Sequence, residues 1–117
     1  SDLRWNSGNG QVTYDTSTRL VKDDIEDINY GLNIINQLKP RRYKRNDDNN
    51  KVEIGFIADE VLPLIPEIVP IGKKSFITKN EADTEDIPIN VDYRKVCVVL
   101  TKAIQELSAK VTALENA

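Results

Sequence analysis

The stretch VDYRKVCVVLTKAIQELSAKVTALE, residues 91–115, carries the most regular pattern in the chain. Its apolar residues recur at alternating steps of four and three, and we call them the heptad seam: Tyr93, Cys97, Leu100, Ile104, Leu107, Val111 and Leu114. This spacing predicts a helix that starts near Asp92 and forms a coiled coil with copies of itself. The alternative is an amphipathic helix packed on its own domain. Polar residues near the C-terminal end leave only a narrow apolar stripe, which favours the coiled coil.

The totals restrict both the size of the fold and the chemistry it can carry. The chain has 117 residues, a net charge of -3, one cysteine (Cys97) and no histidine. We therefore expect one globular core, residues 1–91, followed by the coiled-coil helix, residues 92–117. The charge does not indicate binding to nucleic acid or membrane, so the expected partner is protein. A single cysteine excludes an internal disulfide, and the lack of histidine makes a zinc site or a histidine-based triad improbable. No metal and no cofactor are expected, and no glycine-rich phosphate loop is visible.

The first 91 residues predict an α+β fold with one covering helix. Apolar residues at three- and four-residue steps predict an amphipathic helix over Ile25–Leu38 that ends before Pro40. Arg42–Lys44 and Val52–Ile57 predict two strands of a small antiparallel sheet, joined by a polar loop. We expect the helix to cover this sheet.

Shorter signals complete the prediction. The Gly-Asn-rich residues 7–10 and the alternating stretch Gln11–Tyr14 predict a turn and one arm of a hairpin, within an insertion that covers residues 6–21. Residues 58–62 predict a helical turn stopped by proline. Residues 76–78 predict a short strand, followed by an exposed loop that reaches residue 89.

Five separated blocks of the sequence resemble one family in the family's own order. The blocks are SDLR (1–4) with the lysine of KDDIED (22–27), QLKP (37–40) before Tyr43, IGFIA (54–58), IPEIV (65–69), and VDY (91–93) leading into AIQEL (103–107). Together they resemble the C-terminal intramolecular chaperone domain of phage tail spikes, neck appendages and endosialidases. The resemblance implies a homotrimer that guides folding of the upstream fibre of the same polypeptide and then cuts itself off. It also implies a virion-associated precursor that is made in the host cytoplasm and is released from this domain after cleavage.

The resemblance assigns the cleavage to a Ser/Lys pair, with the serine as the first residue of the released domain. It places the nucleophile at Ser1 and the base at Lys22, with lesser roles for Asp2 and Arg4. A serine hydroxyl needs a base near neutral pH, and without histidine a lysine in its neutral form can serve. In this interpretation the hairpin-like insertion over residues 6–21 leaves after Trp5 and returns near Val21, which keeps the two halves of the motif adjacent.

A second register places the nucleophile at Ser17, five residues before Lys22. Residues 12–16 then form the last strand of a preceding fibre. Thr18 stands where the family has aspartate, whereas Ser1 is followed by Asp2 as in the family's pattern, so Ser1 is the preferred nucleophile and Ser17 the alternative.

Two other functions remain open from the sequence. A structural trimerisation cap would keep the same fold and coiled coil without proteolysis. An adaptor that binds peptides along a strand edge would need only a sheet. The five blocks argue against the adaptor, and only the Ser/Lys pair separates the cap from the self-cleaving chaperone.

Overall fold

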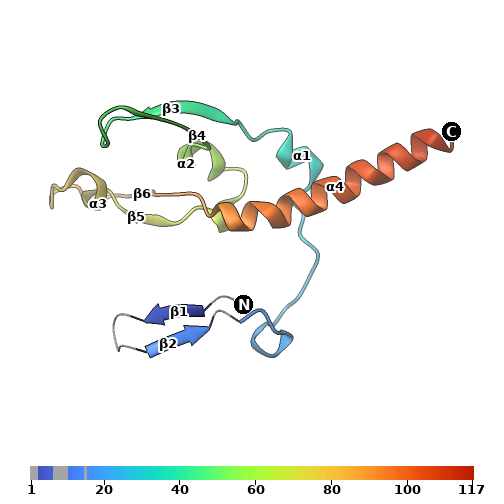
Figure 1. The fold of residues 1–117 in the computed structure, drawn as a ribbon, viewed down its shortest axis with the longest axis horizontal. Helices are drawn as coiled ribbons and strands as arrows, with labels where there is room; N and C mark the ends of the chain where they lie inside the picture. The colour runs from blue at the N-terminus through green and yellow to red at the C-terminus, as the bar shows by residue number, and fades with distance from the viewer. Residues whose placement is uncertain (1–2, 7–10, 15) are drawn as a thin grey trace.

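The computed structural model describes residues 3–6, 11–14 and 16–117, and its side chains from residue 16 onward. Short elements precede one long helix, so the α+β class is confirmed (Figure 1). With η for a 3-10 helix, the elements are β1 (Leu3–Asn6), β2 (Gln11–Tyr14), η1 (Arg19–Val21), α1 (Leu32–Ile35), β3 (Arg41–Arg45), β4 (Lys51–Gly55), α2 (Ala58–Val61), η2 (Pro66–Ile68), β5 (Ile71–Lys73), α3 (Ser75–Thr78), β6 (Asp86–Pro88) and α4 (Tyr93–Glu115).

The strands of the described residues form three separate antiparallel pairs, whereas the sequence predicted one small sheet. β3 pairs with β4 as predicted, with Arg42 opposite Ile54 and Lys44 opposite Val52. β1 pairs with β2, so the predicted hairpin is present, but its first strand already starts at Leu3. The predicted tip at residues 7–10 lies outside the described residues. The third pair joins β5 to β6.

The long helix α4 begins at Tyr93, as the heptad pattern predicted. The Asp92 side chain caps it by accepting a hydrogen bond from the Arg94 amide at 3.1 Å. The Asp92 amide itself donates to the Ile68 carbonyl at 2.8 Å, which fixes the start of α4 against η2.

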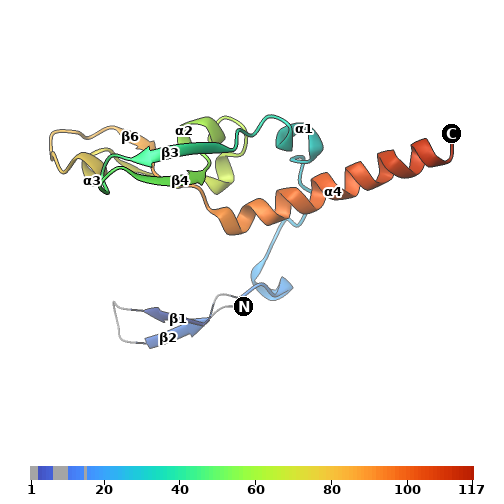
Figure 2. The same ribbon diagram turned by 45° about the horizontal axis from the view of Figure 1, so that its top comes forward.

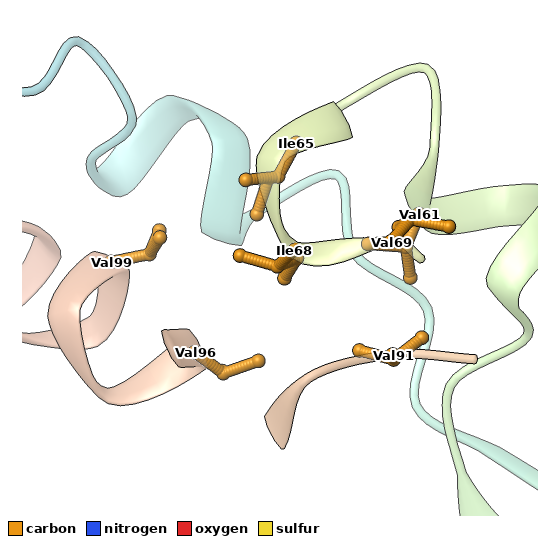
Figure 3. Close-up of a cluster of buried hydrophobic side chains, with 7 residues drawn as sticks. All are labelled: Val61, Ile65, Ile68, Val69, Val91, Val96 and Val99. Carbon is orange, nitrogen blue, oxygen red and sulfur yellow. The ribbon is translucent and has the colours of Figure 1, made fainter. Parts of the chain in front are cut away.

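The core lies between the first half of α4 and the segment that contains α2 and η2. Figure 3 shows its seven buried side chains: Val61, Ile65, Ile68, Val69, Val91, Val96 and Val99. Ile65 and Val61 are the most deeply buried of these large side chains. Val96, Val99 and Ala103 recur at steps of three and four, so one face of α4 packs on its own domain.

The helix predicted over Ile25–Leu38 is wrong. Only α1 is helical there, and it packs on α4 instead of covering a sheet. Asp24 has φ of 53°, which no right-handed helix accommodates, and aspartate, asparagine and glycine are weak helix formers. Ile28 and Tyr30 are half-buried while Asn29 between them is exposed, which is the two-residue period of an extended chain.

The strand predicted at residues 76–78 is also wrong, because these residues lie in the single turn α3. Lys79 ends that turn in the left-handed region, with φ of 61°. The strand that pairs with β5 is instead β6, which lies inside the stretch predicted as an exposed loop.

The N-terminal hairpin and the following chain lie apart from the core. Figures 1 and 2 agree that residues 16–27 approach α4 from one side, while β3 and β4 lie on its other side. Within the described ranges, no helix is long and apolar enough to cross a membrane.

Candidate functional site

The structure brings together the side chains of Ser17 and Lys22. The Lys22 Nζ donates a hydrogen bond to the Ser17 Oγ at 2.8 Å. The 3-10 turn η1 lies between the two residues and reverses the chain, closed by the bond from the Lys22 amide to the Arg19 carbonyl at 3.1 Å. Thr18 caps this turn through its side chain, which accepts from the Leu20 amide at 3.5 Å. A hydroxyl and an amine thus share one hydrogen bond across a five-residue interval.

Three large apolar side chains close to this pair in the sequence are exposed in the single chain. Leu20 is 92% exposed, and Val21 and Ile25 are also largely exposed. Ser17 and Lys22 are exposed as well.

The preferred nucleophile of the sequence prediction, Ser1, and its neighbour Asp2 lie outside the described residues. Arg4 lies in β1, where its backbone pairs with that of Thr13. The roles predicted for Ser1, Asp2 and Lys22 therefore stay predictions, as does the role of Ser17. The geometry adds that Ser17 is within hydrogen-bond distance of the predicted base.

The chain that follows the pair is fixed to the core by a tyrosine. The Tyr30 hydroxyl donates to a Glu67 carboxylate oxygen at 2.8 Å. This hydrogen bond, together with burial and the negative charge of Glu67, raises the pKa of Tyr30 above its ordinary value. Residues 22–29 thus form a connection between the Ser17–Lys22 pair and a defined point at η2.

The heptad seam runs along the face of α4 next to the buried one. All seven of its residues are exposed, from Tyr93 near the core to Leu114, which is 77% exposed. One face of α4 thus packs on its own domain, as one of the two alternatives predicted, while the seam face lacks cover from described residues of the chain, and the coiled coil stays a prediction.

Sequence analysis missed the exposed apolar residues next to Lys22 in the sequence, Leu20 and Val21. Leu20 and Val21 were treated as part of an insertion, although their side chains flank the predicted base. The sequence signal for the turn η1 is Thr18, because threonine commonly caps the start of a helix. A 3-10 turn of three residues is too short to give a periodic apolar pattern.

Comparison with known proteins gives a match over the middle of the chain. Residues 17–70 match the model of a peptidase family described as "Chaperone of endosialidase". The match begins at Ser17 and covers Lys22, β3, β4, α2 and η2. No curated protein and no solved structure matches the chain. Residues 17–70 therefore match the chaperone-of-endosialidase family, and the resemblance inferred from the sequence is confirmed over these residues.

Proposed function

We propose that the chain is a C-terminal intramolecular chaperone that assembles as a homotrimer, guides folding of the upstream fibre of the same polypeptide, and then releases itself by cleavage before Ser17. The observation that carries the proposal is the 2.8 Å hydrogen bond between Ser17 and Lys22, at the first residue of the family match. The family's description supports the chaperone role, and its place among peptidases supports self-cleavage. By the resemblance, the fibre is a phage tail spike or appendage, made as a virion-associated precursor in the host cytoplasm.

The chemistry follows from the two side chains. In the form of an N→O acyl shift, the Ser17 Oγ attacks the carbonyl carbon of Thr16, and its proton passes to the neutral amine of Lys22. Lys22 then returns that proton to the Ser17 nitrogen as the C–N bond breaks, which leaves Thr16 esterified to the Ser17 oxygen. Water hydrolyses the ester and yields the Thr16 carboxylate and free Ser17. Each chain would react once, because the bond that is cut belongs to the same polypeptide.

The same proposal can be written with Ser1, so the choice of nucleophile must be tested directly. Ser17 is favoured by its contact with Lys22 and by the start of the family match. Ser1 is favoured by the Asp2 that follows it, since Thr18 stands at the corresponding place after Ser17. With Ser17, the β1–β2 hairpin belongs to the upstream part; with Ser1, it stays with the released domain.

The heptad seam supports the assembly step. Its exposed apolar residues would be buried between copies of α4, which would bring the chains into register before their upstream parts fold. Joining the chains at one end makes later contacts between them effectively intramolecular. The number three comes from the resemblance, because a mixed seam does not set the number of strands.

The decisive experiment expresses the chain with its natural upstream segment and measures the mass and first residue of any released domain. We expect a product that begins at Ser17, no release from Ser17→Ala or Lys22→Met, and normal release from Ser1→Ala. Ser7→Ala is the matched control for loss of a serine hydroxyl nearby. Release that Ser1→Ala abolishes and Ser17→Ala spares would return the nucleophile to Ser1. An intact, trimeric precursor in every case would support the structural trimerisation cap instead.

A further inference from the structure

The β3–β4 hairpin has one face that is occupied by ion pairs. Opposite residues of an antiparallel pair point to the same side, so alternate residues of both strands form each face. On the first face, the Arg41 guanidinium binds the Glu60 carboxylate at 2.7 Å, and Arg45 binds Asp47 at 2.6 Å. Lys51 lies 3.7 Å from Glu53 on the same face. The charges of this face are balanced within the chain.

The other face, which we call the cationic face, consists of Arg42, Lys44, Val52 and Ile54. All four side chains are exposed, and Ile54 is 82% exposed. Among residues 16–117, neither Arg42 nor Lys44 has an ion-pair partner. Two cations thus stand beside two uncovered apolar side chains, which is the surface expected to bind an acidic segment that also carries an apolar side chain.

The chain holds one such segment directly after Lys22. This acidic segment, residues 23–27, carries the carboxylates of Asp23, Asp24, Glu26 and Asp27, with Ile25 between them at 58% exposure. Across the part of the chain with described side chains, none of the four has an ion-pair partner. The acidic residues near the β5–β6 pair differ, because Glu85 binds Lys74 and Asp86 binds Lys73, each at 2.9 Å.

Within one chain the two surfaces are separated. Figures 1 and 2 show the acidic segment and the β3–β4 hairpin on opposite sides of α4. α4 also carries the heptad seam, which is where copies of the chain would meet. The cation-bearing hairpin of one copy would therefore be free to reach the acidic segment of another.

We infer that the cationic face of one copy docks on the acidic segment of a second copy, next to that copy's Ser17–Lys22 pair. The inference rests on the proposed function for the assembly of the chains, and it adds the contact that completes the site. Docking would bury Ile54 against Ile25 and would exclude water beside Lys22. Removal of water disfavours a charged amine, so the contact would favour the neutral form that can accept the serine proton. Cleavage would then wait until the chains had assembled.

Crosslinking between differently tagged copies tests the contact. Both copies carry Cys97→Val, which keeps an apolar seam residue. Both also carry Ser1→Ala and Ser17→Ala, which keep the precursor uncut whichever of the two serines is the nucleophile. One copy carries Lys44→Cys and the other Glu26→Cys; after co-expression, a short bis-maleimide links cysteines that lie close together. We expect a linked pair of the two tags at several-fold higher yield than with Lys79→Cys, another exposed lysine, in the β5–β6 connection. Equal yields in an assembled protein would overturn the inference.

Charge reversal supplies a second, functional readout in the otherwise natural precursor. We expect Arg42→Glu with Lys44→Glu to slow release about tenfold or more, and Asp23→Lys with Glu26→Lys to do the same. Combining the four changes should restore most of the rate, while sedimentation shows the same assembly throughout. Lys79→Glu is the control and should leave the rate unchanged. Absence of rescue together with absence of the mixed crosslink would overturn the contact.

The two readouts separate this inference from the proposed function. A mixed crosslink in a precursor that never cleaves would retain the contact and overturn the self-cleavage. Cleavage that proceeds at the normal rate in the charge-reversed variants would retain the self-cleavage and overturn the contact. A further control places both cysteines in the same copy. A crosslinked product at the monomer mass would then show that the contact forms within one chain, and it would overturn the inference that a second copy makes the contact.

Discussion

The hydroxyl of Tyr93 lies 2.8 Å from the amide nitrogen of Phe56 and accepts its hydrogen bond. The two rings also stack, with centroids 5.9 Å apart and planes at 18°. Tyr93 is the first residue of both α4 and the heptad seam, and Phe56 directly follows β4. The contact therefore joins the helix that would assemble the chains to the hairpin that carries the cationic face.

We expect Tyr93→Phe to reduce the free energy of unfolding by about 1 kcal/mol, because the ring contact remains and only the hydrogen bond is lost. Gly55→Ala should act similarly, since a Cβ there would lie 2.6 Å from the Tyr93 hydroxyl and would displace it from the Phe56 amide. Urea unfolding measures both changes. Tyr43→Phe is the control, because it removes a neighbouring tyrosine hydroxyl without touching this bond. A fully wild-type midpoint for Tyr93→Phe would show that water replaces the hydroxyl at no cost.

Substitution of the heptad seam should abolish assembly without unfolding the domain. Ile104→Asp with Leu107→Asp places carboxylates on an exposed apolar stripe, and like charges brought together between helices oppose association. Sedimentation should show monomers, while circular dichroism still reports a folded core. Val98→Asp is the matched control, because Val98 is an exposed valine of α4 off the seam. Unchanged assembly in the double variant would exclude the seam as the interface.

Acid should weaken the link between β3 and α2. The Arg41 guanidinium donates two hydrogen bonds to the Glu60 carboxylate, at 3.0 and 2.7 Å, and this lowers the pKa of Glu60 below its ordinary value. Because the pKa of Glu60 is lower in the folded protein than in the unfolded chain, the pair with Arg41 stabilises the fold above the ordinary glutamate pKa of about 4.3. This stability is lost as the pH falls through the pKa of Glu60 in the folded protein. We expect an NMR titration to give a Glu60 pKa that returns toward the ordinary value in Arg41→Gln. The same Glu60 pKa in both proteins would contradict the assignment.

Loss of the Asp92 cap should destabilise the protein, because the first turn of α4 would lose a hydrogen-bond acceptor. Asp92→Ala removes the acceptor of the Arg94 amide and should reduce the free energy of unfolding by about 0.5–2 kcal/mol. Asp92→Asn keeps a good capping oxygen and should lose much less. Thermal unfolding of the three proteins makes the comparison, and equal losses for alanine and asparagine would assign the effect to the charge rather than to the cap.

The parts of the fold that the sequence predicted have strong local signals. α4 combines a long heptad pattern with a capping aspartate, and the β3–β4 hairpin combines two apolar-polar stretches with a cluster of turn formers. Both elements are determined mainly by residues near one another in the chain, so their predictions were confirmed.

The predictions that failed depend on tertiary contacts. The isoleucines and leucines between residues 25 and 38 have helical spacing, yet Tyr30 reaches Glu67 and Ile28 packs at the core from an extended chain. A helix would have turned these side chains away from η2. In the same way, the partner of β5 could not be found from Asp86–Pro88 alone, because three residues give no period.

The candidate site was predictable as residue types but not as a geometry. The sequence supplied Lys22 with two serines, and spacing alone left Ser1 and Ser17 open. The contact made by Ser17 depends on the 3-10 turn η1, which a sequence pattern does not reveal. The cationic face needed the register of β3 on β4, which sets Arg42 and Lys44 on the side away from the ion pairs.

The last turns of α4 extend past the core, and every residue from 107 to 117 is exposed. So short a piece of helix is only marginally stable in water by itself. In the proposed assembly it would gain order chiefly when other copies pack against it. Its helix content should therefore rise with protein concentration, even when the core is fully folded. In a cell that is still synthesising the polypeptide, the order of this end of the molecule would depend on how many copies have associated. It would become rigid only after the assembly was complete.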